Sequence, residues 1–166
     1  MDESYLNKNI VSVPYSLIRD LTEKAEKIKD SITLTIGEPD LQPPKELIEF
    51  GCEYAKTHKL TYTHAGGGEK IRTLVAEHYN KYYGAKTNAN CVTMHIGSME
   101  GLSSILKTIL NPDDEVILPT PFFSPYEQIV KIAHGRAVYL DTREDNFVIK
   151  PEAIEKVLTN KTKRRS

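Results

Sequence analysis

The chain has little cysteine: Cys52 and Cys91 are the only two in 166 residues. Two cysteines are too few for a disulfide scaffold, and their spacing does not fit a metal site. The histidines show no HExxH motif or other ligand spacing either. We therefore expect reduced, partly buried thiols and no bound metal.

An excess of charge and long apolar runs are absent as well. The 22 basic and 23 acidic side chains give a net charge of -1, so no chain-wide field attracts nucleic acid or an anionic membrane. Met1 is followed by a polar run rather than the apolar core of a signal peptide, and no apolar run approaches the roughly 18 residues that span a bilayer. These absences predict a soluble, cytoplasmic protein without a nucleic-acid or membrane partner.

The remaining composition is that of a globular protein, with 39% hydrophobic and 27% charged residues. After residue 91, apolar runs of strand length alternate with segments whose apolar residues recur every three or four positions. This alternation favours an α/β layer fold with parallel strands. The expected helices cover about 14–30, 43–58, 71–83, 98–110, 126–133 and 151–158, and the expected strands cover 32–36, 91–96, 115–118 and 137–140.

The strongest candidate site is the glycine turn at Gly97, where the expected strand ending at Ile96 passes directly into a helix. Amides at a helix start, with the helix dipole behind them, bind anions such as a phosphate group. Ser98 adds a hydroxyl to this turn. The alternative is that Gly97 only allows a tight turn and that Ser98 only caps the helix.

Two other features are weaker candidates. The glycine run 66–68 lacks both the GxGxxG spacing of dinucleotide folds and the lysine of a Walker loop. We interpret it as a flexible loop that carries Tyr62 toward a partner surface. Phe122 and Phe123 follow the strand at 115–118 and could cover a planar ligand at its carboxyl end, although such a pair is more often part of a core.

Four stretches occur in an order and at a spacing that are informative together. They are LTIGEPDLQPP at 34–44, TYTHAGGGEKIR at 61–72, HIGSMEGL at 95–102 and NPDDEVILPTPFFSPY at 111–126. In this order they resemble the N-terminal part of the class I/II aminotransferases, the fold-type I enzymes that use pyridoxal 5'-phosphate. The resemblance covers nearly the whole chain from Val13 onward.

The resemblance implies roles for individual residues. The implied cofactor-binding residues are Gly97, Ser98, Met99, Phe123 and Tyr62. Amides of the turn would hold the cofactor phosphate, and Phe123 would stack on the pyridine ring. Tyr62 would reach the cofactor phosphate of the other subunit, which implies a homodimer. Gly37 would bind substrate, because the absence of a side chain lets the backbone approach the substrate carboxylate.

The resemblance also implies a reaction of amino-acid metabolism, the transfer of an amino group from an amino acid to a 2-oxo acid. No lysine here lies in the context of the family's Schiff-base lysine. We therefore expect no catalytic residue in this chain and no turnover by the 166 residues alone. The alternatives are a noncatalytic truncated module that pairs with a full-length relative, and another fold-type I enzyme such as a lyase.

The implied fold is a three-layer αβα large domain that is incomplete here. Residues 1–40 would form an N-terminal arm and part of the small domain, and residues 41–166 the first part of the large cofactor-binding domain. The family's sheet has the strand order 3-2-4-5-6-7-1, and a truncated chain of this kind would supply strands 1, 2 and 3. We therefore expect the strand at 91–96 to stand alone, apolar faces to stay bare and the isolated chain to be poorly stable.

Overall fold

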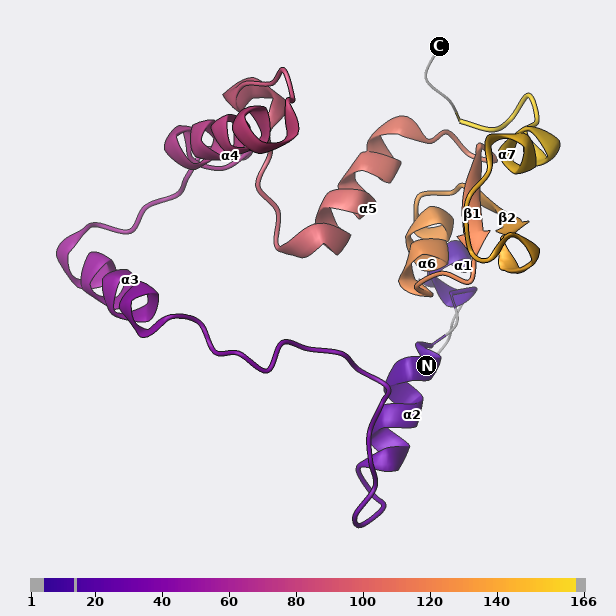
Figure 1. Ribbon diagram of the computed structural model, residues 1–166, viewed down its shortest axis with the longest axis horizontal. Helices are drawn as coiled ribbons and strands as arrows, with labels where there is room; N and C mark the ends of the chain where they lie inside the picture. The colour runs from indigo at the N-terminus through magenta and orange to yellow at the C-terminus, as the bar shows by residue number, and fades with distance from the viewer. Residues whose placement is uncertain (1–4, 14, 164–166) are drawn as a thin grey trace. The chain divides into compact units, whose positions relative to one another are not determined.

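The computed structural model describes residues 5–13 and 15–163, which divide into two units. Figure 1 labels the helices and strands along the chain. The first unit combines residues up to Thr35 with residues from Ser98 onward, and the second unit is Ile36–Gly97. The first unit holds α1 (Lys8–Val11), α2 (Leu17–Ala25), α5 (Gly97–Ile109), β1 (Glu115–Thr120), α6 (Pro125–Ile132), β2 (Arg136–Asp141), η3 (Arg143–Asp145) and α7 (Pro151–Val157). The first residue of α5, Gly97, is also the last residue of the second unit. The second unit holds α3 (Lys45–Thr57), α4 (Glu69–Tyr83) and η2 (Ala89–Cys91). The expected domain boundary at residue 40 stays a prediction.

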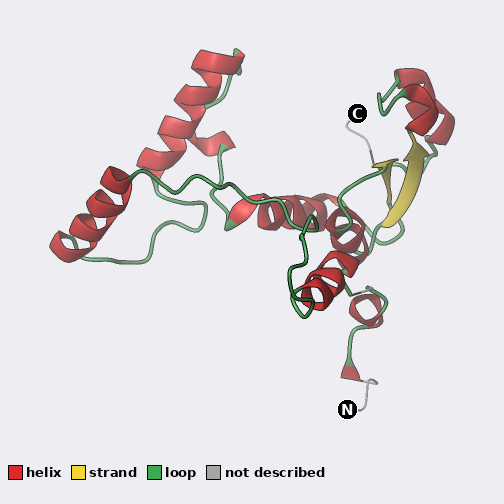
Figure 2. Ribbon diagram, turned by 60° about the horizontal axis from the view of Figure 1, so that its bottom comes forward, coloured by secondary structure: helices red, strands yellow, loops and turns green. Residues whose placement is uncertain are grey.

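The sheet of the first unit has β1 at its centre. β1 pairs in parallel with β2, with Glu115 opposite Arg136 (Figure 2). The first residue of β1 is also bridged in parallel to Thr162: the Glu115 amide donates to the Lys161 carbonyl, and the Lys163 amide donates to the Glu115 carbonyl, both at 2.9 Å. The two strands expected near 115 and 137 are therefore confirmed, and they are parallel as predicted.

The first unit has a small core where α6 packs on the two strands. Its buried hydrophobic side chains are Leu118, Val130, Ala133 and Leu140, and Val130 is only 1% exposed. α6 begins at Pro125, which fits the first turn of a helix because proline has no amide to leave unpaired there. α7 begins at Pro151 in the same way.

The turn between α6 and β2 uses its glycine for space. His134, with φ of 62°, takes the left-handed conformation that ends the helix. A Cβ on Gly135 would lie 2.9 Å from Leu110 Cδ1 and 3.2 Å from Val130 Cγ1. The left-handed residue that ends the helix is therefore His134, and Gly135 is needed for close packing.

The second unit is built mainly around α4. This helix is followed by Gly84 in the left-handed conformation, with φ of 64°, so it ends at the residue expected for the helix at 71–83. The Asn80 side chain holds the following loop, because its Nδ2 donates to the Thr87 carbonyl at 2.8 Å and its Oδ1 accepts from the Thr87 amide at 2.9 Å. α4 packs on η2, and Ala76 is its buried residue.

Three expectations are corrected by the structure. Residues 32–36 and 91–96 form no strand within the described chain. Their apolar composition favours an extended path, but a strand also needs a partner that supplies ladder hydrogen bonds. Both cysteines are exposed rather than partly buried. One further difference concerns the N-terminus, where α1 is a short helix that the sequence pattern misses. Pro14, the expected start of a helix, lies outside the described residues.

Much apolar surface remains exposed, as predicted. Large hydrophobic side chains such as Leu34, Leu47 and Ile105 are more than half exposed. α3 and α5 contain no buried residue, although each carries an apolar face. None of the helices within residues 5–13 and 15–163 is long and apolar enough to cross a membrane.

Candidate functional site

The turn that starts α5 is shaped by Gly97. Its φ of 79° lies in the region that favours glycine, and its amide donates to the His95 carbonyl at 3.0 Å. A Cβ built on Gly97 would meet no atom within 4 Å. The glycine is therefore required by the backbone conformation and not by crowding, and the space beside it is open.

The start of α5 has the chemistry of a phosphate site. The helix is 13 residues long, so its first-turn amides carry a partial positive charge of roughly half an elementary charge. The amides of Ser98 and Met99 lie in this turn, and Ser98 is exposed together with Gly97. Glu100, also in the first turn, adds a negative charge that weakens the attraction for an anion. Backbone donors of this turn can hold a phosphate.

The aromatic pair after β1 divides into two different environments. Phe122 stacks on Tyr139 of β2, with ring centroids 5.9 Å apart and an interplanar angle of 9°. The Phe123 ring meets the Tyr126 ring edge-on, with centroids 5.7 Å apart and an interplanar angle of 86°, and the Phe123 side chain is half exposed. The Phe122 ring is therefore occupied by packing, whereas Phe123 leaves aromatic surface available at the carboxyl end of a parallel strand, where α/β folds bind ligands.

An acid-base network fixes the ring on which Phe122 stacks. The Lys131 ammonium lies 2.7 Å from the Glu127 carboxylate on α6. Hydrogen bonds from Lys131 and then from Tyr139 lower the pKa of Glu127, and the same contacts raise the pKa values of Lys131 and Tyr139. These contacts link Tyr139 on β2 to Glu127 on α6.

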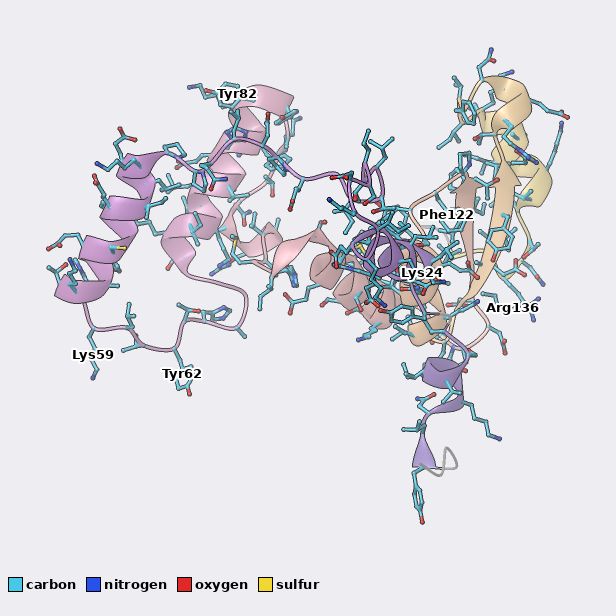
Figure 3. The ribbon with its side chains drawn as sticks, turned by 90° about the horizontal axis from the view of Figure 1, so that it is seen from below. Lys24, Lys59, Tyr62, Tyr82, Phe122 and Arg136 are labelled. Atoms are coloured by element: carbon cyan, nitrogen blue, oxygen red, sulfur yellow. The ribbon has the colours of Figure 1, made fainter. Side chains whose placement is uncertain are left out.

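The remaining two implied site residues belong to the second unit. Tyr62 lies on the extended segment between α3 and α4, and its side chain is fully exposed and points away from the ribbon (Figure 3). Gly37 lies on the extended path before α3, and a Cβ there would meet nothing within 4 Å. The structure brings Gly97, Ser98 and Met99 together in one helical turn. Phe123, Tyr62 and Gly37 each lie on a separate loop.

The glycine run 66–68 makes hydrogen bonds through two of its carbonyls, and its flexibility stays a prediction. The Met94 amide donates to the Gly66 carbonyl at 2.9 Å, and Arg72 Nε donates to the Gly67 carbonyl at 3.0 Å. Sequence reasoning gave Arg72 no role. Its position in α4, four residues after Gly68, was the available signal, because a long cationic side chain at a helix start can reach the carbonyls of the preceding loop.

Comparison with solved structures defines the class of protein. Aspartate aminotransferase from Thermus thermophilus with maleate matches with a TM-score of 0.89 at 27% sequence identity, over 95% of this chain and 43% of that one. The matched structures are fold-type I transferases of the pyridoxal-phosphate class, and this chain is a mixed helix and strand portion of that α/β fold. The expected fold class is confirmed.

Sequence comparison identifies the family. The profile "Aminotransferase class I and II" matches residues 29–166, and the chain belongs to this family. Aspartate aminotransferase of Pyrococcus horikoshii is 34% identical over 158 residues, which are 94% of this chain and 40% of that protein. Asparagine--oxo-acid transaminase of Streptococcus mutans is 28% identical over 164 residues, 95% of this chain and 42% of the relative. The chain thus spans about two fifths of the length of these relatives, in agreement with the N-terminal portion that its motifs predict. Members of the family use pyridoxal phosphate.

Proposed function

We propose that this chain supplies the cofactor-phosphate turn of a pyridoxal-phosphate-dependent aminotransferase, which moves an amino group between an amino acid and a 2-oxo acid. One observation carries the proposal: Gly97 takes a positive φ at the start of α5, and a Cβ there would meet no atom within 4 Å. Its sequence context is the third of the four family motifs. Family membership supports the reaction class.

The residues of this chain would bind and orient the cofactor. The amides of Ser98 and Met99 and the Ser98 hydroxyl would donate to phosphate oxygens. The half-exposed Phe123 ring would pack against the planar ring system. When bound, pyridoxal phosphate supplies a ring that withdraws electrons from the substrate Cα. The Gly37 backbone would approach the substrate carboxylate, since no side chain blocks it.

The proposed assembly is a cytoplasmic homodimer. Full exposure of Tyr62 on an extended segment supports a role outside its own subunit, as a phenol that donates to the cofactor phosphate of a second copy. The exposed apolar faces of α3 and α5 support further packing. One relative is an aspartate aminotransferase and another acts on asparagine, so we propose α-amino acids as the substrate class and no single substrate.

The proposal is tested by ligand binding and by turnover. 4-Deoxypyridoxine 5'-phosphate keeps the ring and the phosphate but lacks the aldehyde, so surface lysines cannot trap it. We expect the chain to bind it and to bind 4-deoxypyridoxine, which lacks the phosphate, much more weakly. Aspartate with 2-oxoglutarate and pyridoxal phosphate should give no transamination above the rate of the same mixture without protein, because the chain has no lysine in the family's catalytic context. Equal affinity for the two ligands would contradict the phosphate assignment, and measurable turnover would contradict the missing-lysine argument.

A further inference from the structure

The Arg72 side chain joins two segments of the second unit. It lies in the first turns of α4 and is half-buried. Its Nε donates to the Gly67 carbonyl at 3.0 Å, and its Nη1 donates to the Ala89 carbonyl of η2 at 2.6 Å. One planar guanidinium therefore holds the glycine loop before α4 and the 3-10 turn after it in a fixed relation.

The glycine loop in turn lies directly against the segment that follows η2. The Met94 amide donates to the Gly66 carbonyl at 2.9 Å. A Cβ on Gly67 would lie 2.4 Å from Met94 Cγ and 2.7 Å from Met94 Cβ, and Gly67 has a φ of 94°. Gly67 is thus required both by its conformation and by close packing. The loop cannot shift without moving Met94.

Met94 stands three residues before Gly97 on an extended segment. Within residues 5–13 and 15–163 this segment belongs to no strand, so no sheet ladder sets its path. The hydrogen bond to the Gly66 carbonyl holds the Met94 amide against the glycine loop. A chain of contacts therefore runs from Arg72 through Gly67 and Met94 to the backbone that leads into Gly97.

We propose that Arg72 is a positioning residue for the phosphate turn: it holds the glycine loop against Met94 and thereby sets the path of the backbone that enters Gly97. The inference rests on the proposed function, because it assigns Arg72 a purpose at that same site. Lysine cannot replace it fully, since one ammonium on a flexible stem cannot match the fixed fork that reaches carbonyls on two segments.

The test compares Arg72→Met and Arg72→Lys with Lys70→Met in the full chain. Lys70→Met removes a positive charge from the same helix turn, and Lys70 is exposed. Amide hydrogen exchange at Met94 reports the coupling, and the affinities for 4-deoxypyridoxine 5'-phosphate and 4-deoxypyridoxine report the turn. In Arg72→Met we expect exchange at Met94 to accelerate roughly tenfold and the affinity for the phosphate ligand to fall roughly tenfold, the effect of about one charge-assisted hydrogen bond. Arg72→Lys should show smaller changes in both the exchange rate and the affinity, and Lys70→Met should change neither.

Exchange at the Thr87 amide separates positioning from general unfolding. Its hydrogen bond to Asn80 lies at the other end of α4, so a local role predicts unchanged exchange there. Gly67→Ala is a second variant, which should accelerate exchange at Met94 by pushing it away and leave Arg72 in place. Unchanged exchange at Met94 in Arg72→Met would overturn the inference, as would equal acceleration at Thr87. If the unmodified chain does not discriminate between the two ligands, the proposed function fails, whereas exchange at Met94 still decides whether Arg72 positions this segment.

Discussion

Replacing Gly97 by alanine tests the candidate site most directly. The residue has a φ of 79°, and an added Cβ would meet no atom within 4 Å. The substitution therefore adds no clash, and its whole cost is conformational. Gly84→Ala is a matched control: Gly84 has a φ of 64° and is equally open, but it lies at the far end of α4.

The magnitude follows from the energy of the left-handed region. A non-glycine residue there costs about 1–2 kcal/mol. If the alanine variant leaves this conformation, the amides of Ser98 and Met99 lose their arrangement. To bind the ligand, the alanine variant must return to the left-handed conformation, and the cost of doing so is subtracted from the binding free energy. The affinity for a phosphate ligand should therefore fall by about 5- to 30-fold. Alanine also restricts the unfolded chain, but that effect changes stability and not the affinity of the folded turn.

The assay is calorimetric titration with 4-deoxypyridoxine 5'-phosphate. We expect weaker binding by Gly97→Ala and, within twofold, normal binding by Gly84→Ala. The helix content of both variants is followed by circular dichroism, since the two substitutions impose similar strain on a helix end. Normal affinity in Gly97→Ala would refute the reasoning that the positive φ shapes the site. Equal losses in both variants would show that strain acts through general unfolding.

Three further predictions follow from the same geometry. Glu100→Gln removes a negative charge from the first turn of α5. Because the repulsion falls by about 0.5–1 kcal/mol, titration should show the phosphate ligand binding about two- to fivefold more tightly. Unchanged affinity would mean that the anion binds elsewhere. The contacts of Glu127 with Lys131 lower the pKa of Glu127 in the folded chain from its ordinary 4.5. These contacts therefore stabilise the fold above pH 4.5, and this stabilisation is lost as the pH falls through the lowered pKa of the folded chain. Hydrogen-exchange protection of α6 should decline on acidification, and Glu127→Gln should remove that part of the pH dependence. Because few hydrophobic side chains are buried, calorimetry of the isolated chain should show no sharp cooperative transition, and a sharp two-state peak would contradict the expected poor stability.

The local structure of the chain was largely predictable from the sequence. The three-four periodicity predicts α3, α4, α5 and α6 to within a few residues, since one apolar stripe per helix is visible without tertiary information. Gly84 and the prolines at the starts of α6 and α7 mark helix ends because their backbone preferences are intrinsic. The turn at Gly97 is predictable for the same reason, since its shape depends on the φ of one residue and on the helix that follows.

Tertiary structure decided what depends on partners distant in sequence. Residues 91–96 have strand composition but form no strand, because a ladder needs a neighbouring backbone. Phe122 and Phe123 look equivalent in the sequence, and only the position of Tyr139 on β2 shows that one ring is covered and the other half exposed. The Arg72 guanidinium donates to the carbonyls of Gly67 and Ala89, which lie before and after α4 in the sequence. Only the fold brings these two carbonyls within reach of one side chain. Periodicity and backbone preference are properties of short segments, so the sequence alone determines them, whereas pairing and burial depend on which segments meet in space.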